Sequence, residues 1–375
     1  MEIFILKYGI ELIGIGMEEN TNTFQGTFID LFAGIGGFRI AFSKEGYKCV
    51  FSSEINKHCQ EVYFNNYNEL PYGDITKINP KDIPDFDILT GGFPCQPFSI
   101  CGRRKGFEDT RGTLFFNICN IIKEKQPKVV VLENVKHLVH HDKGNTFKVI
   151  IESLEDLGYW VTYKVLNAKD FGVPQNRERI IIVASKYSKF DFNKLHYNLT
   201  PPKVKDILDD KIENVQYLSK DEYTLLDEVR QQDSGLLFVG YRNKGIWKKG
   251  IRPNTEHLSR VHRQPNRIYS VEGIHPTIPS QETSGRFFIY LPEIDKVRKL
   301  TINECYKLMG FPEDFKKSNI IGEAYKQIGN SVCVSLIQEI ARQISEQGLL
   351  MEVKSNGLQR KIVRTFQQSL FAKIG

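Results

Sequence analysis

The 375-residue sequence lacks the patterns of several large protein classes. Its seven cysteines are scattered, odd in number and never spaced as CxxC, which argues against a disulfide framework and a zinc site. No apolar run is long enough to cross a membrane, and Glu2 and Glu11 stand where a signal peptide would carry basic residues. Internal repeats and low-complexity tracts are absent as well. We therefore expect a soluble cytoplasmic protein with no bound metal.

The composition is that of a globular protein with one unusually basic segment. Hydrophobic residues make up 41% and charged residues 26% of the chain, enough for a sizeable core, and the length suggests two domains or one large domain with an insertion. The net charge of +6 is concentrated in residues 241–269, which hold eight Lys or Arg against Glu256 alone and interleave Tyr241, Trp247 and Tyr269. A solvated loop explains such a stretch, but so does a surface that follows nucleic-acid phosphates, which we favour.

Short apolar runs alternate with helical patterns in the first half, which is typical of a parallel α/β sheet. We predict strands over 27–32, 49–53, 86–90, 128–132, 159–166 and 180–184, and helices over 38–44, 60–66, 113–125 and 146–157. From about residue 189 to 294 the sequence is charged, contains prolines and is too long for a loop, so we expect a second domain there. Helical patterns return at 302–309 and 324–345, before a basic tail.

A glycine-rich turn and a following acid indicate a nucleoside cofactor. Gly34, Gly36 and Gly37 lie between the first strand and its helix, where the backbone turns tightly and a ligand can approach the helix N-terminus. Glu54 ends the next strand and is suited to two ribose hydroxyls, and Asp74 follows where an adenine amino group is expected. A dinucleotide and S-adenosylmethionine fit this corner equally well, and a mere packing turn remains an alternative.

Three further groups of residues follow later strands and converge on the same crevice. Cys95 stands between Pro94 and Pro97, which end the strand and stiffen the loop. Glu133 follows a buried apolar strand, and the segment QNRER at 175–179 opens the last one. Each alone has an ordinary explanation, such as a buried thiol or a salt bridge. A nucleophile, an acid and two arginines beside a cofactor turn form a candidate active site.

These blocks resemble the DNA cytosine-5 methyltransferases of bacterial restriction–modification systems. The segments FIDLFAGIGGFRIAF, GDIT, GGFPCQPFS, GFEDTRGTLFF, PKVVVLENVK, QNRERI, RKLTINECYKLMGFP and AYKQIGNSV occur in the family's order. The resemblance implies a Rossmann-like S-adenosylmethionine-dependent methyltransferase: a mixed sheet with helices on both faces, plus a smaller target-recognition domain. We expect a catalytic domain over 1–205 with 1–23 as a loose extension, a recognition domain over 206–320, and a returning C-terminal segment over 321–375.

The resemblance also assigns roles in catalysis. The Cys95 thiolate adds to C6 of a cytosine that is flipped out of double-stranded DNA, and C5 then takes the methyl group. Protonated Glu133 hydrogen-bonds ring N3, while Arg179, helped by Arg177, binds the base O2 and positions the other two. The loop over residues 98–107 closes on the flipped base.

Cofactor and DNA contacts carry over by position. The expected cofactor residues are Phe32, Gly34, Gly36, Glu54, Ile55, Asp74, Ile75, Pro94, Leu114 and Asn330. The expected DNA contacts are Ser99, Arg103, Arg104, Lys248, Lys249, Arg263, Arg267, Gln281 and Arg286, with surface salt bridges as the alternative for the last four. Ile55 departs from the family, because a close relative has an aromatic there that stacks on adenine.

We expect a monomeric DNA methyltransferase that protects host DNA from a cognate endonuclease, and three other functions are alternatives to it. A tRNA methyltransferase of the same fold would share every catalytic block but not so large a middle domain. A dehydrogenase explains neither Cys95 nor residues 175–179. A non-catalytic DNA-binding relative would be expected to lack Cys95 or Glu133, and both are present.

Overall fold

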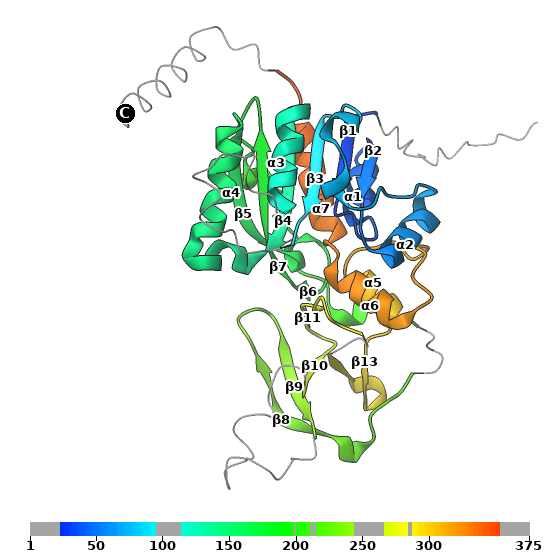
Figure 1. The fold of residues 1–375 in the computed structure, drawn as a ribbon. Helices are drawn as coiled ribbons and strands as arrows, with labels where there is room; N and C mark the ends of the chain where they lie inside the picture. Colours follow the sequence, from blue (N-terminus) through cyan, green and yellow to red (C-terminus); the bar gives the residue numbers. More distant parts are fainter. Residues whose placement is uncertain are drawn as a thin grey trace, which may run out of the picture.

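The computed structural model describes residues 23–94, 114–198, 200–210, 212, 215–243, 266–283 and 287–352 (Figure 1). A six-stranded sheet with helices on both sides forms the upper part of the view, and a smaller five-stranded sheet lies below it. Among the described residues, no helix is both long and apolar enough to cross a membrane.

The large sheet has the strand order β2-β1-β3-β4-β7-β5. Its strands are β1 (Gly26–Leu31), β2 (Tyr47–Ser53), β3 (Ile88–Gly92), β4 (Val129–Val135), β5 (Trp160–Asn167) and β7 (Glu178–Ser185). Strands β1 to β4 pair in parallel as the pattern predicts, but β7 is antiparallel to both β4 and β5. The sheet is therefore mixed, as the family resemblance implied, whereas the local pattern of the first half alone indicated parallel strands. The segment after β5 is too short for a crossover helix, which a parallel return needs.

Two layers of helices cover the sheet. Helices α1 (Gly37–Lys44) and α7 (Val334–Glu346) pack on one face, and α3 (Leu114–Lys125) and α4 (Asn145–Asp156) on the other. Each face of the sheet forms a hydrophobic core with its helices. Successive residues of β4 alternate between the two cores: Val129 and Val131 belong to the one beneath α1 and α7, and Val130 and Leu132 to the one beneath α3 and α4. Helix α2 (Lys57–Tyr67) follows β2. This alternation fixes which residues at the strand ends can point into the crevice.

The C-terminal helical pattern divides into separate elements. Helix α5 (Ile302–Lys307) begins with a capping box between Thr301 and Glu304. The pattern over 324–345 is two helices, α6 (Ile321–Asn330) and α7, because Ser331 and Cys333 have extended backbone angles. The prediction of continuous helical structure there is thus wrong at the break. The interruption turns the Ser331 carbonyl toward the large sheet, where it accepts a hydrogen bond from Arg177.

The middle region forms a sheet of its own, in which the sequence pattern assigned no strands. Its order is β13-β12-β10-β9-β8, comprising β8 (Tyr223–Gln231), β9 (Leu237–Arg242), β10 (Arg267–Ser270), β12 (Phe288–Leu291) and β13 (Lys296–Lys299). All pairs are antiparallel except β10 with β12. A separate two-stranded pair, β6 (Gln175–Asn176) with β11 (His275–Pro276), joins this region to the catalytic half. Short 3-10 helices complete the fold: η1 (Ile75–Lys77), η2 (Pro80–Asp82), η4 (Lys136–Gly144), η5 (Ala168–Phe171), η6 (Phe192–Lys194), η7 (Val204–Ile207), η8 (Lys220–Glu222) and η10 (Pro292–Ile294).

Candidate active site

The glycine turn between β1 and α1 has the geometry that its sequence predicts. Phe32, Gly34 and Gly36 all have positive φ angles, so the chain reverses sharply at the end of β1. A Cβ on Gly37 would lie 2.7 Å from Val332 Cγ2, so only glycine allows this close contact with the segment between α6 and α7. A Cβ on Gly34 would meet no atom within 4 Å, since this residue faces open space. The turn is closely packed on one side and open on the other.

Glu54, the residue after β2, is hydrogen-bonded directly to this turn. Its Oε2 accepts a hydrogen bond from the Gly34 backbone N–H at 2.8 Å, and its Oε1 accepts one from the Asn56 N–H at 2.8 Å. Each carboxylate oxygen retains acceptor capacity after one such bond. The carboxylate is therefore held in a fixed orientation with lone pairs left for a ligand.

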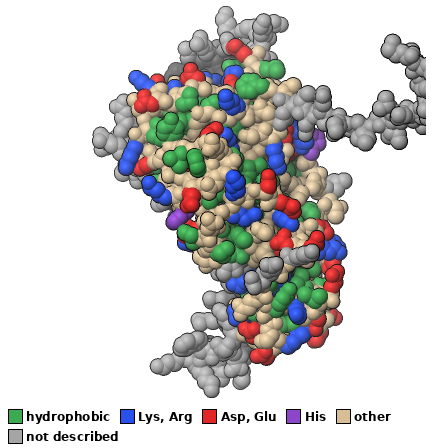
Figure 2. Space-filling view, turned by 90° about the vertical axis from the view of Figure 1, so that its right-hand side faces the viewer, with side chains coloured by type: hydrophobic (Ala, Val, Ile, Leu, Met, Phe, Trp, Pro, Cys, Tyr) green, Lys and Arg blue, Asp and Glu red, His purple; other side chains and the backbone are tan. Residues whose placement is uncertain are grey.

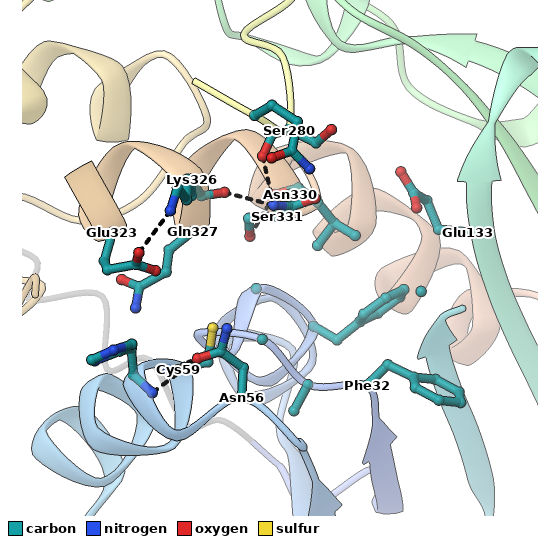
Figure 3. Close-up of a pocket in the computed structure, with 18 residues that line it drawn as sticks. Phe32, Asn56, Cys59, Glu133, Ser280, Glu323, Lys326, Gln327, Asn330 and Ser331 are labelled. Carbon is teal, nitrogen blue, oxygen red and sulfur yellow. Dashed lines mark hydrogen bonds and ion pairs between the residues drawn. The ribbon is translucent and has the colours of Figure 1, made fainter. Parts of the chain in front are cut away.

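A cavity of about 440 Å³ opens beside the turn (Figure 3). One end is formed by Gly92 and Glu133, and the glycine turn forms a wall. Helices α2 and α6 form the third side. The lining residues are Phe32, Ala33, Gly34, Gly37, Phe38, Asn56, His58, Cys59, Gly92, Glu133, Ser280, Gln281, Glu323, Lys326, Gln327, Asn330, Ser331 and Val332.

Glu133 and Arg179 form an ion pair at the first end of this cavity. Arg179 Nε lies 3.0 Å from Glu133 Oε1, and both side chains are largely buried. Burial raises the pKa of Glu133 above its usual range, against the opposing charges of Arg179 and Arg177. The carboxyl group is thus easier to protonate than an exposed glutamate, which suits a hydrogen-bond donor to a ring nitrogen.

Asn134 links this pair to the loop that follows β3. Its buried Nδ2 donates to the Phe93 carbonyl at 2.7 Å, and its Oδ1 accepts from the Val135 N–H at 2.8 Å. Phe93 stands two residues before Cys95, so the start of the cysteine loop is tied to the end of β4. Cys95 itself lies outside the described residues.

Arg177 lies in a different environment from Arg179. It is only 2% exposed, and its guanidinium donates to the carbonyl oxygens of Ile278 at 3.1 Å, Gly329 at 3.1 Å and Ser331 at 2.7 Å. Burial lowers its pKa. The side chain therefore connects the catalytic half to the middle region and to the end of α6, whereas the sequence predicted a contact with the target base.

Asn330 and its neighbours fasten the middle region to this wall. Asn330 Nδ2 donates to the Ser280 carbonyl at 2.9 Å. A Cβ on Gly329 would lie 2.2 Å from the Pro279 carbonyl oxygen, so the two backbones are in direct contact there. Gln281, predicted to contact DNA, lines the cavity next to Ser280.

The other predicted residues are placed as follows. Gly36 is packed against the Tyr67 ring, and Ile55 is 69% exposed. Asp74 caps η1, and the hydrogen bonds that it accepts from Thr76 hold the pKa of Asp74 below its usual range. Ile75 and Leu114 belong to the core beneath α3, Pro94 does not line the cavity, and Arg267 stacks over the Phe238 ring at 5.4 Å. Outside the described residues lie Cys95, Ser99, Arg103, Arg104, Lys248, Lys249, Arg263 and Arg286.

Sequence reasoning missed the residues on the third side of the cavity. Asn56, His58 and Cys59 on or before α2, and Lys326 and Gln327 on α6, were not singled out. Two signals were available for Gln327: it lies in the segment AYKQIGNSV that contributes to the family resemblance, and it precedes Asn330 by three residues, a spacing that puts both on one helix face. The described residues include no group of three or more His, Cys, Asp or Glu able to hold a metal ion.

The mixed sheet with its reversed β7, the glycine turn and the acid that follows β2 form a Rossmann-like domain that is suited to a nucleoside-containing cofactor. The C-5 cytosine-specific DNA methylase family matches residues 26–346, most of the sequence. The chain belongs to that family. It is a type II DNA (cytosine-5-)-methyltransferase of restriction–modification systems, with S-adenosylmethionine as its methyl donor and DNA as its substrate.

Known relatives agree with this assignment. The type II methyltransferase M.HhaI of Haemophilus parahaemolyticus is 43% identical over 328 residues, covering 84% of this chain and 93% of the relative. M.NgoBI of Neisseria gonorrhoeae is 44% identical over 328 residues, covering 88% and 95%. Among solved structures, the methyltransferase EhMeth of Entamoeba histolytica superposes with a TM-score of 0.62 at 18% identity, covering 87% of this chain and 99% of that one. The Dnmt2 methyltransferase of S. pombe superposes with a TM-score of 0.61 at 20% identity, covering 86% and 99%. These superpositions concern the fold alone.

Proposed function

We propose that the cavity between the glycine turn, Glu133 and α6 is the place where a flipped-out cytosine meets the methyl donor. The Glu133–Arg179 pair is the main support for this proposal. It places a carboxyl group that is easily protonated beside a cation, at the end of a cavity whose wall is the glycine turn between β1 and α1. S-adenosylmethionine supplies an electrophilic methyl group when bound. The residues of the chain do the rest: they bind the cofactor, activate the base and exclude water.

The nucleophile is Cys95, on the strength of the sequence resemblance. Cytosine C5 is too weak a nucleophile to take a methyl group unaided, and addition of a thiolate to C6 makes it an enamine carbon. A free thiol with a pKa of roughly 8.5 is mostly protonated at neutral pH, so the site must favour the thiolate. The Asn134–Phe93 hydrogen bond supports this assignment, since it anchors the chain two residues before Cys95.

Glu133 and Arg179 act on the base from the opposite side. Protonated Glu133 donates a hydrogen bond to ring N3 and stabilises the charge that builds up as the thiolate adds. Arg179 binds the base O2 and keeps the carboxyl group in place through the 3.0 Å contact. Once C5 carries the methyl group, a base from solvent takes the C5 proton. The C–H electron pair restores the C5=C6 double bond, and the C6–S pair leaves with the Cys95 thiolate.

Arg177 has a positioning role. Its three backbone carbonyl partners satisfy most of its donors, so little of the guanidinium is available to a base. It holds the wall formed by the end of α6 and by Ile278 against the strand that carries Arg179. This role replaces the direct base contact expected from the sequence.

The cofactor is held by residues near the turn. Gly34 leaves open space at the wall, Glu54 has free acceptor capacity for ribose hydroxyls, and Asn330 stands at the opposite side. The residues thus fit S-adenosylmethionine. Asp74 and Ile75 are kept as adenine contacts because η1 begins beside the end of β2, where Tyr72 bridges Ser53.

The middle region, 206–320, is assigned to target recognition. The five-stranded sheet supports this, as does the fastening of its 278–281 segment to the cavity wall. Acidic and basic side chains are interspersed on the face seen in Figure 2, so the phosphate contacts are assigned to the basic segment 241–269, most of which lies outside the described residues. We further propose a monomer that acts in the cytoplasm beside a cognate endonuclease.

A comparison of variants tests the assignment of the active site. Cys95→Ala should abolish methyl transfer while leaving DNA affinity unchanged, because the thiol forms the adduct and makes no contribution to groove binding. Methylation is measured with labelled S-adenosylmethionine, and affinity by fluorescence anisotropy. Cys101→Ala, in the same loop, is the matched control and should keep full activity. Turnover that survives in Cys95→Ala would exclude covalent catalysis.

A further inference from the structure

Gln327, on α6, is a buried carboxamide that has no adequate partner among the described residues. It is 5% exposed, and neither its Nε2 nor its Oε1 has a well-formed hydrogen bond within the described parts of the chain. Its side chain extends from α6 into the cavity toward α2 (Figure 3). Buried amides are nearly always hydrogen-bonded, so this group calls for a ligand.

The protein groups around Gln327 do not supply that partner. Burial raises the pKa of the Cys59 thiol to about 12, with a weaker opposing effect from its contact with Gln327. The thiol therefore stays protonated and is only a weak hydrogen-bonding group. Lys326 is engaged with Glu323 at 2.8 Å. Asn56 is occupied as the N-cap of α2, where its Oδ1 accepts from the His58 and Cys59 N–H groups.

The shape of the cavity identifies which part of the cofactor reaches Gln327. The sulfonium of S-adenosylmethionine carries three carbon branches: the methyl group, the adenosyl carbon and the aminobutyrate chain. In the proposed function the methyl group faces Glu133, and the nucleoside lies toward Glu54, which stands just behind the cavity wall and accepts a hydrogen bond from Gly34 in that wall. The remaining side of the cavity, between α2 and α6, is left for the aminobutyrate chain.

The chemistry of that side matches an α-amino acid. A carboxamide has both a donor and an acceptor, so Nε2 can donate to the α-carboxylate while Oε1 accepts from the α-ammonium group. The nearby Glu323–Lys326 ion pair is neutral overall, as is the zwitterion. The N-terminal end of α2 also faces this side, which favours a carboxylate there.

We propose that Gln327 binds the α-amino-acid end of S-adenosylmethionine. This inference rests on the proposed placement of the cofactor. A side chain that only filled space between α2 and α6 would affect all fragments of the cofactor equally, whereas a hydrogen-bonding Gln327 should affect only fragments that carry the amino-acid end.

Calorimetric titration of the full chain with two ligands tests the proposal. S-Adenosylhomocysteine retains the amino-acid end, whereas 5′-methylthioadenosine lacks it. Gln327→Ala should weaken S-adenosylhomocysteine binding about tenfold, since two hydrogen bonds of a net ~0.5–1.5 kcal/mol each are lost. Binding of 5′-methylthioadenosine should change less than about twofold. Gln338→Ala is the matched control, because that glutamine lies on α7, outside the cavity, and donates to Glu45 at 2.7 Å.

Two results would overturn the inference. Equal weakening of both ligands would mean that Gln327 only shapes the cavity, and unchanged binding of S-adenosylhomocysteine would mean that it makes no contact. The variant Glu54→Ala tests the cofactor placement separately, because it should weaken the binding of both S-adenosylhomocysteine and 5′-methylthioadenosine. If Glu54→Ala weakens neither, the cofactor placement itself fails. Thermal unfolding without ligand checks that Gln327→Ala is folded, and we expect no loss of stability from removing an unpaired amide.

Discussion

Substitution of Gly329 by alanine should separate the middle region from the cofactor wall. The added Cβ would lie 2.2 Å from the Pro279 carbonyl oxygen, where an ordinary contact needs at least 3.4 Å. The two backbones must therefore move apart by about 1.2 Å, the difference between these distances. Neither partner is the flexible end of a side chain, so the shift cannot be absorbed by a rotamer change.

The expected loss of stability combines three effects. Overpacking of this kind costs about 1–3 kcal/mol. The hydrogen bonds from Asn330 to Ser280 and from Arg177 to Ile278 flank the contact and would weaken, at ~1 kcal/mol each. Alanine regains at most about 1 kcal/mol of helix propensity. The net destabilisation is roughly 2–4 kcal/mol.

Gly322→Ala is the control on the same helix. A Cβ there would meet no atom closer than Thr283 Cβ at 4.0 Å, so the substitution should be neutral or stabilise by up to about 1 kcal/mol. Urea unfolding measures both variants, and titration with S-adenosylhomocysteine should show weaker binding for Gly329→Ala only. A Gly329→Ala protein as stable as the parent, with unchanged cofactor affinity, would refute the reasoning.

Three further predictions concern the catalytic and DNA-binding residues. Glu133→Gln should lower turnover at least about 100-fold in single-turnover assays. Because burial raises the Glu133 pKa, the parent should also lose stability relative to this variant as pH rises from the unfolded pKa through the folded one; a pH-independent difference in urea midpoints would contradict this. Arg177→Met should cost about 3 kcal/mol of stability by leaving three carbonyls unpaired, whereas Arg179→Lys should slow turnover and leave the urea midpoint nearly unchanged. Replacing Lys248 and Lys249 by alanine should reduce the slope of log affinity against log salt by about 2 without changing the methylated site, and an unchanged slope would place both lysines away from DNA.

Local sequence patterns were sufficient to predict the side of the cavity formed by strand ends and the glycine turn, but not the side formed by α2 and α6. The glycine turn and Glu54 were predictable because a strand end, a turn and a helix start leave their signature within a few consecutive residues. The Glu133–Arg179 contact was implied by the family resemblance, and it forms because β7 runs antiparallel to β4 and so begins beside the end of β4. Gln327 and Cys59 could not be assigned in this way, since on a helix they read as ordinary core positions until α2 and α6 are brought side by side.

The two arginines of QNRER show where spacing alone misleads. Residues two apart share a face only within a continuous strand, but Arg177 lies between β6 and β7. Its side chain can therefore turn toward α6 while Arg179 stays at Glu133. The middle sheet was unpredictable for another reason. Several of its strands are only four residues long, and long connections separate β9 from β10 and β10 from β12, so neither alternation nor turn signals accumulate.

Transfer of labelled methyl groups from S-adenosylmethionine tests the central claim most directly. Mixed-sequence DNA and tRNA serve as parallel substrates, with Cys95→Ala as the inactive control. We expect label in DNA alone, at C5 of cytosine within one short sequence motif, and none with Cys95→Ala. Label in tRNA alone would contradict the assignment of the middle region to DNA recognition, while label in neither would contradict the proposed active site.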